Sequence, residues 1–270
     1  MSKGKMLGEG RTAEVYLCNS DKILKLFREW VPKEWIQYED MIAQAVFAAG
    51  VPAPEPFESI QLDGRSGLVY EKINGKSLLK LMNTKPWNIS GYAKQMAQLH
   101  FQIHQSSSST EKIPTMKEKM AYAIKKAEPI LGEKTEQIIT YMNSLPSGNN
   151  ICHGDFHPDN ILVSDKLWVA IDWMGAYVGN PLSDVARSSL MLHAPSITPG
   201  IPKSVVKILK DKIYSSYIKE YKKLAHVKWE DVESWMLPVA AARIWEEIPG
   251  EKKWLLSMID NKLNQIENLP

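Results

Sequence analysis

Cysteine is scarce in this sequence, which has 270 residues and only Cys18 and Cys152. Two cysteines exclude a disulfide framework and a four-cysteine zinc site. Long apolar runs are also missing, and none approaches the length that spans a membrane. No block of one charge sign stands out, because 33 basic and 31 acidic residues are mixed along the chain and leave a formal net charge of +2. We therefore expect neither nucleic acid nor a membrane as a partner.

The hydrophobic content and the length favour a globular protein of two lobes. Hydrophobic residues make up 44% of the sequence, which suffices for a sizeable core. The N-terminus leads directly into a glycine-rich segment at Gly8 and Gly10, so we expect no cleaved signal and a cytoplasmic location. A monomer and a homodimer are equally compatible with the sequence.

Asp155 and Asn160 lie in the segment that carries the strongest chemical signal, which runs from His153 to Asn160 and is followed by Asp172. Asp155 and Asn160 are five positions apart, as in the H-R-D-x-x-x-x-N loop of kinases, where the Asp takes the proton of the attacking hydroxyl and the Asn holds Mg²⁺. Asp172 is then the second metal carboxylate. An ordinary polar turn before a strand explains any one of these residues, but not three at matched spacing.

Two short apolar runs flank a polar turn at 164–166 between Asn160 and Asp172. This pattern predicts a hairpin, which would return Asp172 to the neighbourhood of Asn160. Carboxylate and amide oxygens are the hard ligands that Mg²⁺ prefers, and phosphoryl transfer depends mostly on positioning and on neutralising charge. The segment therefore predicts a magnesium-dependent phosphoryl-transfer site.

The N-terminal part offers independent support. Gly8 and Gly10 lie in a turn between two strand-like runs, where backbone N–H groups can approach phosphate oxygens closely. Ala13 occupies the third glycine position of the kinase pattern. Lys25 interrupts the next strand-like run and has the setting of the lysine that contacts the α- and β-phosphates. A lone strand lysine often faces solvent, but Glu39 in the following helical segment (32–49) is a suitable ion-pair partner.

These motifs together resemble the aminoglycoside phosphotransferase and choline kinase group of small-molecule kinases, over nearly the whole chain. Four further segments carry the resemblance: Gly50-Val51-Pro52-Ala53-Pro54 after Glu39, the strand and hinge at 68–78, Gln98-Leu99-His100, and Gly179 to Ala186. Asn180 replaces the usual Asp of that last segment, whereas Asp184 occupies the position that braces the catalytic loop in the family.

The resemblance implies a bilobal α+β protein-kinase-like fold, with ATP and Mg²⁺ as cofactors. A small antiparallel sheet (residues 1–74) would bind the nucleotide, and a mainly helical lobe (residues 75–270) would carry the catalytic loop and a helical cap. The implied site residues are Asp155 as catalytic base, Asn160 and Asp172 as metal ligands, His153 and Asp184 as support of the catalytic loop, and Gly8, Gly10, Lys25, Glu39, Glu71 and Ile73 around the nucleotide. The implied activity transfers the γ-phosphoryl group of ATP to a hydroxyl of a small molecule.

Three departures from the protein-kinase sequence pattern argue against a protein as substrate. Asp172 is followed by Trp173 and Met174 rather than Phe-Gly, the loop is His-Gly-Asp rather than His-Arg-Asp, and no Ala-Pro-Glu segment follows. An atypical protein kinase and a nucleotide-binding pseudokinase stay open as alternatives. The acceptor and the choice between ATP and GTP are also open.

The acceptor site is expected among helices at about Lys203–Leu224, Trp229–Glu247 and Gly250–Asn268, which would form the cap. Trp173 is a candidate acceptor contact, because it adjoins Asp172 and aromatic faces attract cations and sugars. Several acidic residues of the cap suit a polyamine, although solvated helix faces explain them equally well; they are Glu230, Asp231, Glu233, Glu246, Glu247 and Glu251.

Overall fold

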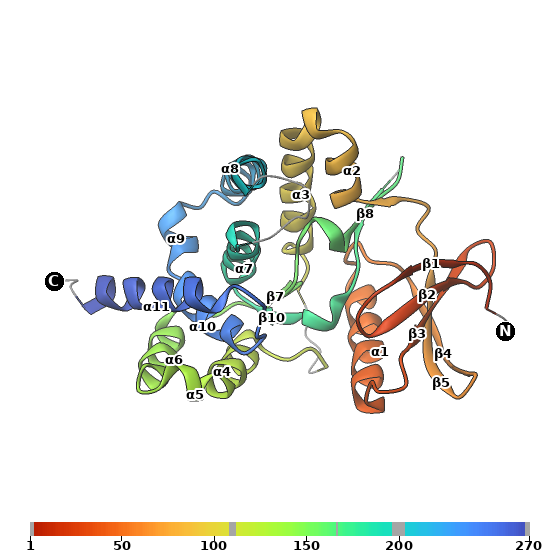
Figure 1. The fold of residues 1–270 in the computed structure, drawn as a ribbon, viewed down its shortest axis with the longest axis horizontal. Coiled ribbons are helices and arrows are strands. Elements are labelled where there is room, and N and C mark those ends of the chain that lie inside the picture. The colour runs from red at the N-terminus through yellow and green to blue at the C-terminus, as the bar shows by residue number, and fades with distance from the viewer. Residues whose placement is uncertain (1–2, 108–111, 166, 196–202, 268–270) are drawn as a thin grey trace.

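The computed structural model describes residues 3–107, 112–165, 167–195 and 203–267. Its N-terminal part is an antiparallel five-stranded sheet of order β1-β2-β3-β5-β4, with one helix, α1 (Lys33–Ala48), packed against it (Figure 1). The strands are β1 (Met6–Glu9), β2 (Ala13–Leu17), β3 (Lys22–Phe27), β4 (Pro56–Leu62) and β5 (Arg65–Glu71). The expected small antiparallel sheet is confirmed.

Alternation along β3 decides which way Lys25 points. Leu24 and Leu26 are fully buried in a small cluster on one face of the sheet, together with Val69. Successive side chains of a strand point to opposite faces, so Lys25 lies on the face covered by α1. Glu39 of α1 is buried on that same face. The strand period therefore brings the two charged residues together.

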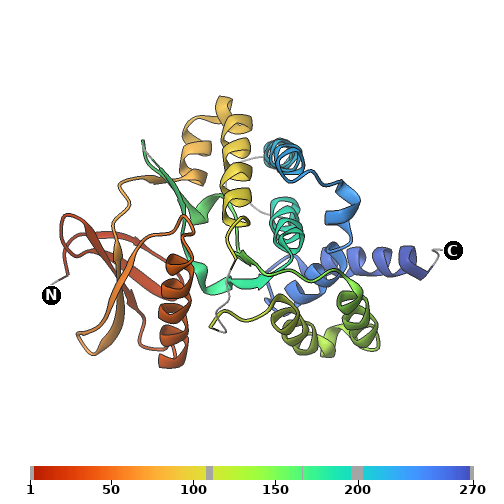
Figure 2. The same cartoon turned by 180° about the vertical axis from the view of Figure 1, so that it is seen from behind.

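The C-terminal part is mainly helical and surrounds one large core. Helices make up most of this part (Figures 1 and 2), and one of them, α10 (Met236–Ile244), has every residue buried. The other helices before the catalytic segment are α2 (Leu78–Thr84), α3 (Ile89–Ile103), α4 (Met116–Lys126), α5 (Glu128–Leu131) and α6 (Lys134–Ser144), with a 3₁₀ turn at Pro86–Asn88. A mainly helical C-terminal part is confirmed, whereas the division of the chain at residue 74 stays a prediction.

The expected hairpin before Asp172 is present. Strands β8 (Ile161–Val163) and β9 (Trp168–Ala170) pair antiparallel, and β6 (Lys76–Ser77) adds a third strand. Residue 166 of the turn lies outside the described residues. A second small ladder pairs β7 (Asn150–Cys152) with β10 (Tyr177–Gly179), and 3₁₀ turns η2 (Pro158–Asn160) and η3 (Trp173–Gly175) connect the strands. Helix α7 (Pro181–His193) follows β10 directly.

The cap helices differ from the expectation in one respect. The helix expected over Trp229–Glu247 is two helices, α9 (Trp229–Glu233) and α10, because the chain turns at Ser234 and Trp235. Pro238 therefore lies in the first turn of α10, where its missing N–H costs no helical hydrogen bond. The remaining cap helices are α8 (Lys203–Ala225) and α11 (Lys252–Glu267), and the expected end at residue 268 lies outside the described residues.

None of the helices in the described ranges is both long and apolar enough to cross a membrane.

Candidate functional site

The loop from His153 to Asp155 follows β7 and passes very close to the segment after Asp172. Gly154 has φ +74°, and a Cβ at this position would lie 2.1 Å from the carbonyl oxygen of Gly175. Only glycine combines this backbone conformation with such an approach. The close contact places the loop of Asp155 beside the segment that follows Asp172.

Asn160 and Asp155 are joined directly. The Asn160 amide donates from Nδ2 to the Asp155 carbonyl (3.0 Å) and to its carboxylate Oδ2 (3.1 Å). Because the NH₂ group is used in this way, the Oδ1 atom is the end of the Asn160 side chain that can bind a metal ion. The five-residue spacing read from the sequence thus corresponds to one 3₁₀ turn, η2, that folds the amide back onto the carboxylate.

Asp155 is held as a carboxylate. Partial burial raises its pKa, but the His157 ring (3.5 Å from Oδ2) and the Arg187 guanidinium (3.5 Å from Oδ1) outweigh burial and hold the pKa well below its usual range. A carboxylate with a low pKa orients a hydroxyl and accepts its proton only as the transfer proceeds. The environment therefore suits a positioning base rather than a strong one.

Asp172 lies where the hairpin was expected to return it. The Ile171 amide donates to the Asn160 carbonyl at 2.9 Å, which fixes the two segments side by side. Asp172 has φ 63° and ψ 65°, a left-handed conformation that Asp tolerates better than most residues. This conformation leaves the Asp172 carboxylate half exposed, with Oδ1 3.6 Å from Lys25 Nζ.

Lys25 is shared between two carboxylates. Its Nζ donates to Glu39 Oε1 at 2.6 Å and faces Asp172, and Tyr70 Oη donates to the same Glu39 oxygen at 3.4 Å. Burial lowers the pKa of Lys25, but the charges of Asp172 and Glu39 more than compensate, so the pKa lies above its ordinary value. The predicted pairing of Lys25 with Glu39 is confirmed, and the cation lies between the sheet and the metal segment.

The donor set fits a hard divalent cation. Asp172 and the Oδ1 end of Asn160 offer oxygen atoms on neighbouring segments, and oxygen is the ligand type that hard divalent cations prefer. Both residues are partly exposed, so an ion with its own water ligands has access.

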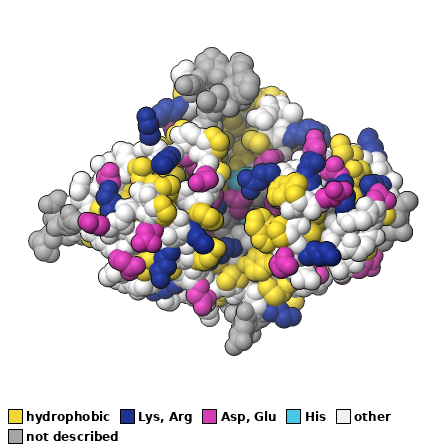
Figure 3. Space-filling view, turned by 60° about the horizontal axis from the view of Figure 1, so that its bottom comes forward, with side chains coloured by type: hydrophobic (Ala, Val, Ile, Leu, Met, Phe, Trp, Pro, Cys, Tyr) yellow, Lys and Arg dark blue, Asp and Glu magenta, His cyan; other side chains and the backbone are white. Residues whose placement is uncertain are grey.

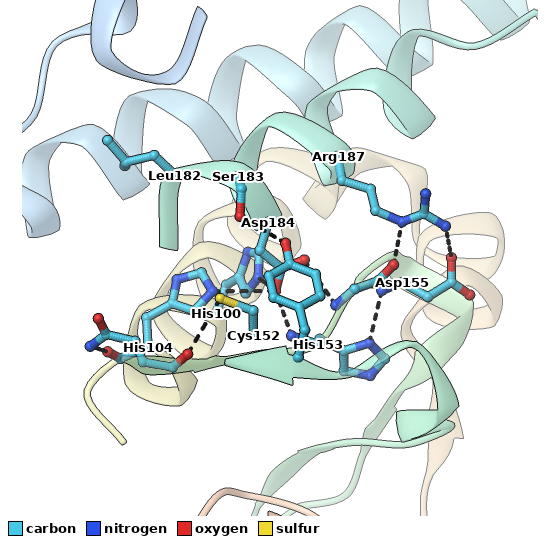
Figure 4. A network of polar contacts seen from close by, with 12 residues as sticks. His100, His104, Cys152, His153, Asp155, Leu182, Ser183, Asp184 and Arg187 are labelled. Carbon is cyan, nitrogen blue, oxygen red and sulfur yellow. Dashed lines mark hydrogen bonds and ion pairs between the residues drawn. The ribbon is translucent and has the colours of Figure 1, made fainter. Parts of the chain in front are cut away.

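His153 and Asp184 both support the catalytic loop. His153 accepts the Asp155 N–H at Nδ1 (3.2 Å) and donates from Nε2 to the Ile171 carbonyl (3.0 Å). Asp184, at the N-terminal turn of α7, accepts the backbone N–H groups of His153 (2.5 Å) and Gly154 (3.0 Å). These contacts tie the base to the residue before Asp172 and to α7 (Figure 4).

The prediction that Trp173 contacts an acceptor is wrong. Its side chain is 5% exposed and lies in the main core, where its Nε1 donates to the Ala170 carbonyl at 2.9 Å. The ring packs against His153 with centroids 4.4 Å apart. Adjacency to Asp172 misled the prediction, because the turn η3 directs the indole inward while the carboxylate points outward.

The glycine-rich turn follows β1, and the hinge lies at the end of β5. The Gly10 amide donates to the Ala13 carbonyl at 2.8 Å, and a Cβ built at Gly8 meets nothing within 4 Å. At the hinge, the Glu71 amide donates to the Glu55 carbonyl and the Ile73 carbonyl accepts the Gly75 amide. These contacts engage the Glu71 amide and the Ile73 carbonyl inside the protein.

Sequence reasoning missed Arg187 and Lys119. Arg187 donates from Nε to the Gly154 carbonyl and from Nη1 to Glu246 Oε1 (2.6 Å), besides facing Asp155. Lys119 of α4 donates to the carbonyls of residues 174, 175 and 176 at 3.1, 2.7 and 3.2 Å. Burial and the nearby Arg187 lower the pKa of Lys119 to about 8. The sequence could have pointed to Arg187, because it follows Asp184 by three positions and so lies on the same helix face. No sequence pattern singles out Lys119.

Three of the six acidic cap residues already have cationic partners. Glu246 binds Arg187 and Arg243, Glu251 binds Arg243 with both carboxylate oxygens, and Glu233 binds Lys262. Figure 3 shows a hollowed area on one face of the molecule, where basic and acidic side chains and a histidine lie together. Paired carboxylates are less available to a polyamine than the sequence indicated.

Comparison with known proteins agrees with this geometry. The sequence model of the phosphotransferase enzyme family (APH) matches residues 3–199, well over half of the chain. Human acyl-CoA dehydrogenase family member 11 is 25% identical over 188 residues, which cover 62% of this chain but 24% of that protein. The chain thus spans about a quarter of the length of that curated relative.

Solved structures with the same fold cover most of the chain. A thermostable mutant of aminoglycoside phosphotransferase APH(4)-Ia superposes with a TM-score of 0.66 at 13% identity, covering 99% of this chain and 96% of the other. The streptomycin–ATP–APH(2″)-IIa ternary complex gives 0.58 at 16% identity (98% and 91%). A choline/ethanolamine kinase family protein from Mesorhizobium loti gives 0.50 at 13% identity (98% and 88%). The predicted bilobal kinase-like architecture is confirmed, and the chain belongs to the phosphotransferase enzyme family.

Proposed function

We propose that the protein transfers the γ-phosphoryl group of ATP to a hydroxyl of a small molecule, with Mg²⁺ as the metal. The observation that carries the proposal is the convergence of Asp155, Asn160 and Asp172 with the Lys25–Glu39 ion pair, from segments far apart in the sequence. Phosphoryl transfer needs this combination of an orienting carboxylate, oxygen ligands for metal and a cation for phosphate. The ATP complex of APH(2″)-IIa is in keeping with ATP as donor.

Each residue has a separate role in this proposal. Asp155 orients the acceptor hydroxyl and takes its proton as the phosphoryl group passes from ATP to the hydroxyl oxygen and ADP is released. Asn160 Oδ1 and Asp172 would hold Mg²⁺, which would supply charge neutralisation at the phosphates. Lys25, oriented by Glu39, binds the α- and β-phosphates.

The nucleotide base and the phosphates also need backbone contacts. The Glu71 carbonyl would accept the exocyclic N–H of adenine and the Ile73 amide would donate to a ring nitrogen, because the opposite groups of both residues are engaged inside the protein. Gly8 and Gly10 leave space above the turn for phosphate oxygens to approach the backbone.

The acceptor is proposed as a small hydroxylated molecule. The cap carboxylates that pair with Arg187, Arg243 and Lys262 weigh against a polyamine such as an aminoglycoside, although related folds take such acceptors. The expectations of a cytoplasmic location, of no nucleic acid or membrane partner, and of a monomer or homodimer stay predictions.

An acceptor screen tests the proposal. Purified protein is incubated with Mg-ATP and separate hydroxyl compounds: choline, ethanolamine, aminoglycosides, macrolides, homoserine, sugars and nucleosides. ADP release is followed with Asp155→Ala as the control. Acceptor-dependent ADP from the wild type alone supports the proposal and gives the acceptor class. If the protein binds ATP but shows no turnover with any of these compounds, the result would instead support a nucleotide-binding pseudokinase. Phosphorylation of a generic protein would support an atypical protein kinase.

A further inference from the structure

The Asp184 carboxylate accepts four N–H groups inside the core. Two come from the catalytic-loop backbone, His153 and Gly154, as described above. The other two come from α3, where Nε2 of His100 lies 3.0 Å and Nε2 of His104 lies 3.3 Å from Asp184 Oδ2. Figure 4 shows Asp184 between these histidines and the catalytic loop. Asp184 is therefore the point at which α3 and the catalytic loop are joined.

The second ring nitrogen of each histidine faces a tyrosine of α8. His100 Nδ1 lies 2.7 Å from Tyr217 Oη, and His104 Nδ1 lies 2.6 Å from Tyr221 Oη. The two histidines are four residues apart on α3 and the two tyrosines four residues apart on α8, so each pair occupies one helix face. The facing helices thus present two parallel Tyr–His chains that end on one carboxylate.

The chemistry of these contacts constrains where the hydrogen atoms of both rings lie. A carboxylate only accepts, so both Nε2 atoms carry hydrogen. The two rings are buried with centroids 4.1 Å apart, which disfavours a charge on both, and burial together with the neighbouring His104 lowers the pKa of His100 to about 3. A neutral ring that is protonated at Nε2 accepts at Nδ1. The Tyr217 hydroxyl is therefore the donor to His100, and we take the parallel Tyr221–His104 contact to run the same way.

His100 also contacts the catalytic loop through its ring. Phe156, the residue after Asp155, stacks on it with centroids 3.9 Å apart and planes inclined by 18°. Rotation of the His100 ring would disturb both this stack and the contact to Asp184. The orientation of the buried His100 ring is thus linked to the residues before Asp155, through Asp184, and to the residue after it, Phe156.

We propose that Tyr217 and Tyr221 are positioning residues for the phosphoryl-transfer site. By donating to Nδ1, they hold His100 and His104 in the tautomer that Asp184 requires, and Asp184 in turn holds the two amides that precede Asp155. Helix α8, which belongs to the expected acceptor cap, is coupled to the base in this way. The part of this inference that concerns turnover rests on the proposed function.

A metal site is the rival explanation for the same residues. Ligand atoms of His100, His104 and Asp184 lie within 4.8 Å of one another, a separation that a metal ion could bridge. A metal would take the unprotonated Nε2 atoms and force hydrogen onto Nδ1, so the tyrosines would accept. This is the opposite tautomer. The carboxylate oxygen in question also already accepts the His153 amide at 2.5 Å.

Histidine NMR separates the two explanations without any assay of activity. Full-length protein labelled with ¹⁵N-histidine is recorded at neutral pH before and after EDTA, and His100→Gln and His104→Gln assign the two rings. We expect Nε2–H tautomers that EDTA does not change. Tyr217→Phe should shift the His100 ring signals and Tyr221→Phe those of His104, while Tyr214→Phe, on the same helix, should shift neither. Protonation at Nδ1, a response to EDTA, or rings that are indifferent to the tyrosines would overturn the proposal.

Backbone exchange then tests the link to the catalytic loop. In Tyr217→Phe/Tyr221→Phe we expect the His153 and Gly154 amides to exchange at least ~10-fold faster than in the wild type, with core amides of α10 changed much less. Equal acceleration everywhere would mean a general loss of stability and would contradict a positioning role.

The same variants are compared for turnover of Mg-ATP. A roughly 10-fold fall in kcat with KM for ATP little changed is the expected result, and Tyr214→Phe should match the wild type. Unchanged kcat with accelerated exchange would overturn the coupling to the base. Absence of turnover in the wild type would count against the proposed function, whereas the tautomers and the amide exchange would still decide the role of the tyrosines.

Discussion

Arg187 lies with Nη2 3.5 Å from Oδ1 of Asp155 while its Nη1 binds Glu246 at 2.6 Å. The guanidinium therefore joins the proposed base to the junction between α10 and α11. Its Nε also donates to the Gly154 carbonyl, so two contacts of this one side chain are on the catalytic loop and the third is at the junction. Arg243 binds both Glu246 and Glu251, so these two acidic residues of the junction share one cation.

Replacing Arg187 by Met should harm both stability and turnover. The change leaves the Gly154 carbonyl without this donor and Glu246 without one of its two partners, which we expect to cost ~1–3 kcal/mol in free energy of unfolding. Turnover should fall about 10-fold, because the cation that orients Asp155 is lost. Urea unfolding and steady-state kinetics measure the two effects. Lys134→Met, which breaks an exposed pair with Asp260, is the control and should cost at most ~1 kcal/mol.

Gly154→Ala should destabilise the protein far more than Gly132→Ala. Both glycines have positive φ, +74° and +59°, but only at Gly154 would a Cβ meet backbone, 2.1 Å from the Gly175 oxygen. The strain of a sparsely populated backbone conformation costs ~1–3 kcal/mol at either position, and the clash adds to it at Gly154. Thermal and urea unfolding compare the pair. Equal losses of stability would show that the contact between the catalytic loop and the metal segment is not tight.

His100 should make stability depend on pH in the acidic range. Its pKa falls from 6.5 to about 3 on folding, so the unfolded chain binds a proton that the folded chain does not between these values. Stability is then lost as pH falls below about 6.5, with a slope of up to ~1.4 kcal/mol per pH unit from this group. His100→Gln should flatten the slope measured by urea unfolding between pH 7 and 5. His226→Asn, at an exposed position, should leave it as in the wild type.

Lys119→Met should loosen the segment that follows Asp172. Three carbonyl groups, of residues 174, 175 and 176, lose their common donor, and we expect a cost of ~2–3 kcal/mol in free energy of unfolding. Hydrogen exchange of this segment should accelerate. Lys125→Met, an exposed position on the same helix, provides the comparison and should be near neutral. Equal stability of the two variants would contradict a bracing role for Lys119.

The sequence was most informative where local pattern and spacing decide geometry. The hairpin before Asp172, the alternation that turns Lys25 toward α1, and the turn that joins Asn160 to Asp155 all follow from contacts within a few residues or from strand period. The resemblance to the family added the bilobal arrangement and Asp184, which no local pattern would have singled out.

Contacts between distant segments were beyond sequence reasoning. Lys119 meets the carbonyls after Asp172 only because α4 packs beside β10, and Tyr217 meets His100 only because α8 packs along α3. The prediction for Trp173 was wrong for a related reason. The side chain of Asp172 points to the solvent, but the left-handed backbone conformation of Asp172 directs the Trp173 side chain inward. Pro238 indicated the break between α9 and α10, although the helical pattern of apolar residues continues across it.

Turnover of Asp155→Ala compared with the wild type, at saturating Mg-ATP and with an acceptor that the wild type phosphorylates, tests the central claim most directly. We predict a fall in kcat of at least roughly 10²-fold with nucleotide affinity largely retained, because Asp155 acts on the acceptor hydroxyl and not on the nucleotide. Asp172→Ala, measured alongside, should lose affinity for the metal-bound nucleotide as well. Unchanged turnover in Asp155→Ala would contradict the assignment of Asp155 as the base and, with it, the proposed arrangement of the site.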